Sequence, residues 1–337
     1  MPDLRKFGIG SIEALLILVI AVMMIGLSLT TSTFLTLSNL FDLLNQSSVN
    51  IIFAVGLLVV LIAGGIDISF AVGASVAQYL TALTVIRLGG GNWALGFIAA
   101  ACFGFLLGAF NATIIYRFKI VSIVVTIATF NVFFGGLMFL TGGVSIYDLP
   151  DWWVDRVSIV HFDTASGAAN LALPVAVMVA MVAATWLLLR RTTTGRQLYA
   201  MGDNPEAARR VGVNIGAMHY VAFGWLGMMA GIAGLMQAHY VQEVVPNALY
   251  GRELDVLAAV VLGGARLGGG RGTILGAILG ILLTAITANG LNLLGISPYA
   301  FKMIIGAIIL VAITLSSGGF AKLVGSRFAP AGGRAPS

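Results

Sequence analysis

The sequence predicts an all-α integral membrane protein with about ten transmembrane helices, and three observations lead to this prediction. Of its 337 residues, 59% are hydrophobic and only 9% are charged, whereas a soluble domain has about 25% charged residues. The apolar residues form a series of runs that approach the ~20 residues needed to cross a bilayer. The basic residues stand at the ends of these runs, where the positive-inside rule places them. We therefore expect one membrane domain over residues 1–337, embedded in the lipid bilayer, with both termini in the cytoplasm.

The first half of the chain supplies five of the expected spans. The run Ser11–Leu29 follows Arg5 and Lys6 and lacks a convincing cleavage site, so we expect an uncleaved span rather than a signal peptide. The apolar residues of Leu37–Leu44 recur at helical spacing, which indicates either a helix in the interface or the polar start of the second span. The next four spans are expected at Val49–Gly64, Phe70–Ile86, Trp93–Tyr116 and Val121–Leu140.

Two polar segments divide the second half. The segment 141–170 holds four aspartates against one arginine and carries Trp152 and Trp153, which suit a membrane–water interface, so it is expected outside. The sixth span, Leu171–Leu189, ends at two arginines, which places the polar stretch 192–217 in the cytoplasm. The later spans are expected at Met218–Val241, Leu254–Leu262, Thr273–Leu294 and Pro298–Ser316, followed by a cytoplasmic tail at 318–337.

The run Leu254–Leu262 is short for a full crossing, so it either traverses the bilayer or only dips into it, and the span count can change by one or two. The glycine-rich segment Gly263–Gly272 contains no lysine, so we interpret it as a helix break rather than a phosphate loop. Glycines recur every fourth residue beside it and predict close helix packing. These packing glycines are Gly272, Gly276 and Gly280.

The stretch 192–217 contains a short helix with clear signals at both ends, predicted at Pro205–Val211. Asn204 is a good N-cap, and proline at the first helical position loses no hydrogen bond. Gly212 stands where a left-handed residue ends a helix. Charges that match the helix dipole lie in the first and last turns: Glu206, Arg209 and Arg210.

A helix of two turns is not stable in water by itself, so something must hold it. A groove in a partner protein is the expected holder. Ala207 and Ala208 keep the helix thin enough to enter such a groove.

The sequence contains no constellation that indicates an enzyme, a metal site or a bound cofactor. His161, His219 and His239 lie far apart, and no pair has the spacing of a metal site. No serine lies in a GxSxG pattern, and no GxxxxGK[ST] phosphate loop is present. The single cysteine, Cys102, permits no intrachain disulfide. The net charge of +5 is explained by the basic span ends, so we expect no nucleic-acid partner.

A few polar residues stand within or beside the predicted spans. Asp67 lies in the break Gly64–Ser69, where it either caps the third span together with Ser69 or lines a substrate pathway. The amides within spans either bond to a neighbouring helix or together line a pathway for a hydroxylated solute. These amides are Asn111, Asn131, Asn289 and Asn292.

Three motifs carry a resemblance to a known family. The segment 195–212 resembles the cytoplasmic loop of permease subunits in ribose-type ABC importers, the bacterial monosaccharide group. The family pattern is filled here by Gly195, Arg196, Tyr199, Ala200, Gly202, Asn204, Ala207, Ala208, Arg209 and Gly212. The break GGIDIS and the stretch from Glu253 to Gly280 are similar to two further family elements, and the likeness extends over Leu37–Leu315. The chain departs from the family after the break, where Gly73 and Ser75 come later than usual, and this difference bears on the substrate.

The resemblance implies partners, a fold and a mechanism. The chain is expected to adopt the ribose-type permease fold in the bacterial inner membrane and to pair with a second permease subunit, a copy or a paralogue. A separate ABC ATPase would hold ATP and Mg, and a periplasmic or tethered binding protein would deliver the solute. The helix Pro205–Val211 would couple to the ATPase through Glu206 and Arg209, and the pathway would open alternately to each side.

The alternative is an ion-coupled secondary transporter. Such proteins carry ionisable residues deep within their spans. The sequence disfavours this class, because Asp67, Glu253 and Asp255 stand at the ends of predicted spans.

Overall fold

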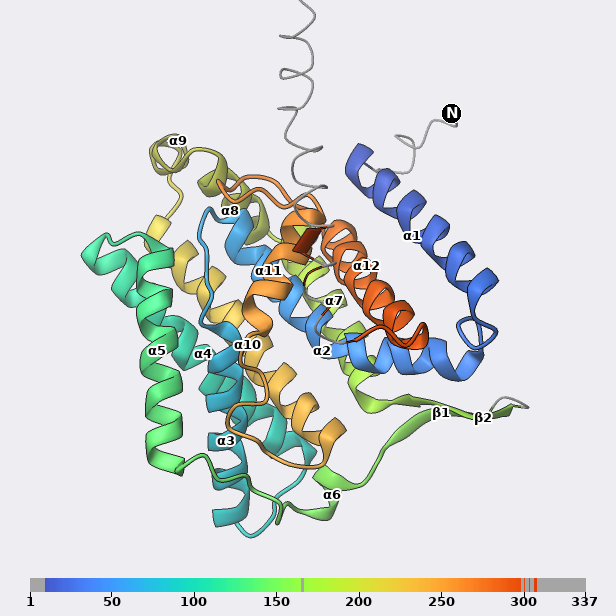
Figure 1. Ribbon diagram of the computed structural model, residues 1–337. Helices are drawn as coiled ribbons and strands as arrows, with labels where there is room; N and C mark the ends of the chain where they lie inside the picture. Colours follow the sequence, from blue (N-terminus) through green and yellow to red (C-terminus); the bar gives the residue numbers. More distant parts are fainter. Residues whose placement is uncertain (1–9, 165–166, 298–299, 301–302, 304–305, 308–337) are drawn as a thin grey trace, which may run out of the picture.

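The computed structural model describes residues 10–164, 167–297, 300, 303 and 306–307, and helices dominate this part of the chain (Figure 1). In chain order the helices are α1 (Ser11–Thr30), α2 (Leu37–Ile62), α3 (Phe70–Arg87), α4 (Trp93–Phe118), α5 (Ser122–Thr141), α6 (Asp151–Val154), α7 (Leu173–Arg191), α8 (Thr193–Asp203), α9 (Pro205–Arg210), α10 (Ile215–Val241), α11 (Arg252–Leu262) and α12 (Ile274–Leu293). Two strands, β1 (Ser158–Thr164) and β2 (Gly167–Ala172), form an antiparallel hairpin.

Among the described residues, eight helices are long and apolar enough to cross a membrane. They are α1, α2, α3, α4, α5, α7, α10 and α12. This confirms the helical membrane fold, and each of the eight matches an expected span. The run Leu254–Leu262, expected as the eighth span, forms α11, which has 11 residues and is too short to cross the bilayer. The expected span Pro298–Ser316, the tail 318–337 and both termini fall outside the described residues, so the predicted total of ten and the placement of the termini stay predictions.

The second helix is continuous from its polar start. Thr36 caps α2 by accepting a hydrogen bond from the amide of Asn39 at 3.3 Å, and the helix runs unbroken to Ile62. The segment Leu37–Leu44 is therefore the start of the span helix, which decides between the two alternatives left by the sequence. The chain then turns at Gly64, whose φ of +87° favours glycine.

The core lies around α2 and α10, which are buried along most of their length, whereas α1 is exposed along most of its own. Helices α4 and α10 cross with their backbones in contact. A Cβ atom on Gly104 would lie 2.1 Å from the carbonyl oxygen of Gly227, and one on Gly231 would lie 1.9 Å from that of Ala100. Only glycine permits this approach, and small residues at helix crossings are typical of membrane bundles.

The segment 141–170, expected as an external loop, contains the short helix α6 and most of the β1–β2 hairpin. Both lie at one end of the bundle, and α8 and α9 lie at the opposite end (Figure 1). Trp152 anchors this region, because its indole Nε1 donates to the carbonyl oxygen of Gly90 at 2.7 Å. Trp153 is fully buried beside it. The two polar segments thus lie at opposite ends of the bundle (Figure 1), and the assignment of one to the cytoplasm and the other to the outside stays a prediction.

Candidate functional site

The short helix predicted in the stretch 192–217 is present as α9 and ends at Arg210, one residue before the predicted end. The side chain of Asn204 accepts a hydrogen bond from the amide of Ala207 at 3.0 Å. Gly212 has a φ of +89°, and the amide of Val213 donates to the carbonyl oxygen of Ala208. Both ends of α9 are therefore closed by the interactions that their residue types favour.

The exposed face of α9 carries Glu206, Ala207 and Arg209. Ala208 points the other way and is 3% exposed, within the hydrophobic core of this chain. The expectation that both alanines make the helix thin enough for a partner's groove therefore does not hold for Ala208, which lies against this chain's own core. A small side chain at position 208 lets α9 lie close to its own bundle, and only Ala207 is open to a partner.

Helix α8, which the sequence analysis did not anticipate, connects α7 to α9. Thr192 caps it by accepting from the amide of Gly195 at 3.0 Å. A Cβ atom on Gly195 would lie 2.4 Å from the carbonyl oxygens of Leu188 and Leu189, so this glycine allows the tight turn out of α7. Arg196 is exposed. Glycine at position 195 thus has a packing role inside this chain.

Three glycines from distant parts of the sequence meet where α8 ends. We call Gly64, Gly202 and Gly269 the glycine junction. A Cβ atom on Gly269 would lie 2.8 Å from the Cα atoms of both Gly202 and Gly64. The amide of Gly270 donates to the carbonyl oxygen of Ile62 at 2.9 Å beside them. The junction therefore joins the α8–α9 segment to the end of α2 and to the loop between α11 and α12.

A tyrosine fastens the same loop from the side of α8. The hydroxyl of Tyr199 donates to the carbonyl oxygen of Gly272 at 2.9 Å. Burial raises the pKa of the Tyr199 hydroxyl above its usual value, which keeps the donor protonated. After this loop, Gly276 and Gly280 lie where α12 crosses α11, against the carbonyl oxygens of Gly263 and Ala259.

Asp67, Ser69 and Asn111 form one buried polar cluster. The carboxylate Oδ1 of Asp67 accepts from the amide and the hydroxyl of Ser69, both at 2.7 Å. The side-chain amide of Asn111 on α4 donates to the Ser69 hydroxyl at 2.8 Å. Ser69 is the N-cap of α3, so Asp67 precedes the helix that it was expected to cap. Asp67 is only 2% exposed and joins the break to α4.

The backbone of this break is irregular, and two of its donors are satisfied by α5. The amides of Ile66 and Ile68 donate to the hydroxyls of Ser122 at 2.9 Å and Thr126 at 3.4 Å. Irregular backbone at membrane depth is tolerated only where protein groups satisfy it. The cluster and the two hydroxyls meet this requirement.

The other predicted pathway amides lie apart from this cluster. Asn131 is exposed on α5 and donates to the carbonyl oxygen of Ile127 in its own helix at 2.8 Å. Asn289 on α12 and Asn39 on α2 exchange hydrogen bonds of 3.1 and 2.9 Å, which pack the two helices together. Asn292 is exposed one turn further along α12. The predicted set therefore divides into three separate places.

The charged residues Glu253 and Asp255 were expected at the end of a span, and the structure corrects this. They lie at the start of α11, whose first residue, Arg252, donates to the side chain of Asn50 at 3.4 Å. Asn50 lies near the middle of α2. The start of α11 is therefore level with the middle of a membrane span, so the argument from span ends does not exclude ion-coupled transport.

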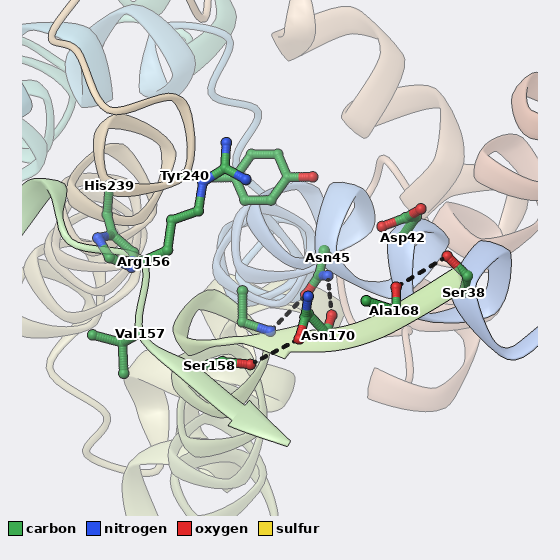
Figure 2. A pocket seen from close by; sticks show the side chains of 11 residues that line it. Ser38, Asp42, Asn45, Arg156, Val157, Ser158, Ala168, Asn170, His239 and Tyr240 are labelled. Carbon is green, nitrogen blue, oxygen red and sulfur yellow. Dashed lines mark hydrogen bonds between the residues drawn. The ribbon is translucent and has the colours of Figure 1, made fainter. Parts of the chain in front are cut away.

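A cavity of about 460 Å³ opens at the hairpin end of the bundle and was not anticipated. Figure 2 shows its lining, which comes from the start of α2, the hairpin and the end of α10. Asp42 and Arg156 are its acidic and basic members. Asn45 joins α2 to β2 in the cavity lining, since its side chain donates to the carbonyl oxygen of Asn170 at 2.8 Å and accepts from the amide of Ala172 at 3.0 Å. The polar residues at the start of α2 were the signal for this feature.

The hairpin beside this cavity carries a histidine with a raised pKa. The side chain of Asn170 contacts the imidazole of His161 and is the main cause of the raised pKa, and the carboxylate of Asp163, at 3.3 Å from the imidazole, adds to it.

No group of three or more His, Cys, Asp or Glu side chains in the described part of the chain could hold a metal ion.

Comparisons with known proteins identify relatives across nearly the whole chain. A family model described as "Branched-chain amino acid transport system / permease component" matches residues 39–313. The chain is 31% identical over 309 residues to the ribose import permease protein of Escherichia coli (strain K12), and the aligned region covers 90% of this chain and 92% of that protein. It is 32% identical over 308 residues to the ribose import permease protein of Bacillus subtilis (strain 168), at 91% and 92% coverage.

A third relative is named for a different sugar. The galactose/methyl galactoside import permease protein of Escherichia coli (strain K12) is 27% identical over 318 residues, which cover 91% of this chain and 94% of that protein. No solved structure matches the chain significantly.

Proposed function

The chain belongs to the family of transport-system permease components and is the multi-pass membrane subunit of an ABC importer, and on this premise we propose that it carries a monosaccharide or a similar small hydroxylated solute. The relatives of the chain support this substrate class, because they include proteins named as ribose and galactose import permeases. The family description also names branched-chain amino acids. The relatives that match over nine-tenths of the chain favour the sugar.

The proposed partners follow from the importer architecture. A second permease subunit completes the pathway, a solute-binding protein delivers the sugar at the hairpin end, and an ATPase docks at the opposite end. ATP and Mg bind to that ATPase, and this chain lacks a GxxxxGK[ST] segment of its own. The hydrolysis chemistry therefore belongs to the partner chain.

The observation that carries the proposal is the placement of α9. This helix protrudes at one end of the bundle with Glu206, Ala207 and Arg209 exposed (Figure 1). The glycine junction binds the same segment to α2 and to the α11–α12 loop. A partner that moves α9 would therefore move the ends of several spans, which is what coupling between ATP hydrolysis and alternating access requires.

The substitution Ala207→Trp tests this docking surface, with Ala207→Ser as the matched small control. Position 207 is exposed, so the tryptophan has no core to disturb and insertion into the membrane should be normal. We expect uptake of labelled ribose by the complete importer to fall more than ten-fold while ATP hydrolysis continues. Uptake equal to that of Ala207→Ser would contradict the assignment of α9 to the ATPase contact.

A competition experiment tests the substrate class. Unlabelled ribose or galactose should reduce uptake of the labelled sugar, and unlabelled leucine should not. Inhibition by leucine and not by sugars would assign the chain to amino acid import.

A further inference from the structure

Helix α11 occupies only part of the membrane thickness. It has 11 residues, which extend over about 16 Å at the rise of an α-helix, roughly half of a hydrocarbon core of about 30 Å. In Figure 1 it lies in the half of the bundle nearer to α8. The connecting segment, residues 242–251, leads to it from the hairpin end of the bundle. The chain thus re-enters the bundle after α10 and begins a helix inside it.

Two contacts locate the ends of α11. At its far end, Gly263 lies against the backbone of Gly276 in the first turn of α12. At its start, Arg252 donates to Asn50, the fourteenth residue of the 26 in α2. That position is about 20 Å along α2 from Leu37 at the helical rise. The charged start of α11 is therefore level with the middle of α2.

Three ionisable side chains lie at this level, and they differ in how deeply they are buried. Glu253 is buried and accepts a hydrogen bond from the amide of Gly251 at 3.1 Å. Arg252 is half-buried and interacts electrostatically with Asp255 one turn later. Asp255 itself is exposed. A carboxylate that faces lipid is costly, and such residues face a cavity or a protein interior instead.

A polar groove continues from this place between α2 and α12. It has a volume of about 270 Å³, and Asn50 is part of its wall. Gln46, one turn before Asn50, and Asn292 on α12 are exposed in the same groove. Arg252 adjoins this groove through its hydrogen bond to Asn50, and Asp255 interacts with Arg252 from one turn further along α11. We call this set the polar ledge and define it as Gln46, Asn50, Asn292, Arg252 and Asp255.

We propose that the polar ledge is the solute-binding station in the middle of the translocation pathway, where it selects a neutral polyhydroxylated molecule; this inference rests on the proposed importer function. Three amides supply both donors and acceptors, as sugar hydroxyls require. The opposite charges of Arg252 and Asp255, the two ionisable members of the ledge, offset one another, and the third ionisable side chain at this level, Glu253, is buried and accepts from the amide of Gly251. The lateral exposure of Asp255 is explained by a water-filled pathway at this surface.

Thiol labelling in the reconstituted importer tests the position of the ledge. In a Cys102→Ala background, Asp255→Cys is exposed to a negatively charged methanethiosulfonate reagent, and Val179→Cys serves as the control. Val179 is 58% exposed near the middle of α7, so its thiol faces the side of the bundle. We expect Asp255→Cys to react at least ten-fold faster, and ribose to slow that reaction at least five-fold. Equal rates, or no protection by ribose, would overturn the proposal.

A second variant covers the case in which Asp255→Cys does not fold. Asn50→Ala should raise the ribose concentration for half-maximal uptake at least ten-fold, with normal co-purification of the ATPase. Asn131→Ala removes an exposed amide that lies off the ledge and should change nothing. If the Asn50→Ala importer still transports ribose with an unaltered concentration dependence, the proposed role of the ledge is refuted and the proposed importer function stands. Absence of ATP-driven ribose transport in the unmodified complex would refute the proposed function.

Discussion

Replacing Gly202 by alanine places one methyl group into the glycine junction. Its Cβ atom would lie 1.8 Å from the carbonyl oxygen of Ile62 and 2.6 Å from the amide nitrogen of Gly270. Real Cβ atoms essentially never approach a heavy atom within 3.0 Å, so the end of α2 or the end of α8 must move by at least 1.2 Å. Both neighbours are backbone atoms, which cannot avoid the methyl by rotating a side chain.

The cost of this change has two parts. Overpacking a tight site costs about 1–3 kcal/mol. The hydrogen bond of 2.9 Å between Gly270 and Ile62 lies directly against the new methyl, and its loss adds about 1 kcal/mol. For a chain of 337 residues, the total of about 2–4 kcal/mol corresponds to a fall of roughly 3–6 °C in the midpoint of thermal unfolding. We also expect ribose uptake to fall more than ten-fold, since the junction connects α9 to the spans.

The assay compares Gly202→Ala with Gly26→Ala in purified, reconstituted importer. A Cβ atom on Gly26 would have no atom within 4 Å, so this control makes the same chemical change without a clash. Thermal unfolding is followed by size-exclusion fluorescence, and uptake is measured with labelled ribose. A Gly202→Ala protein with the unfolding midpoint and uptake of Gly26→Ala would refute the reasoning about the junction.

Two further predictions concern buried polar contacts. Asn111→Ala leaves the Asp67 and Ser69 cluster without its α4 donor and should destabilise the protein by about 1–3 kcal/mol, read from the thermal midpoint; an unchanged midpoint would contradict the structural role of the cluster. Asn289→Leu breaks the reciprocal bonds to Asn39 and should cost about 1 kcal/mol. Asn39→Leu combined with Asn289→Leu should then cost less than the two single changes together, whereas additive costs would show that the pair is not coupled.

The apolar runs and their charged ends predicted the bundle well, for a physical reason. A membrane span must be apolar over about 20 residues whatever its neighbours are, so eight span helices could be found from local composition. The caps of α9 were equally local, because Asn204 and Gly212 act on the backbone beside them. Features that depend only on nearby residues were therefore predictable.

Other features depend on partners distant in the sequence. The depth of α11 is determined by contacts to Asn50 and Gly276, and nothing in its own residues shows where in the membrane it begins. The inward orientation of Ala208 depends on how α9 lies against the bundle. The β1–β2 hairpin did have a local signal in its β-branched residues, Ile159 and Val160, which the composition of the acidic segment obscured.

The central claim is that this chain is the permease of an ATP-driven importer for a sugar-like solute. The most direct measurement is uptake of labelled ribose into proteoliposomes that contain this chain and its co-purified ATPase, with the binding protein outside and ATP inside. The account predicts uptake that requires ATP and persists when the proton gradient and the membrane potential are collapsed. Uptake that proceeds without ATP and stops when those gradients are collapsed would contradict it.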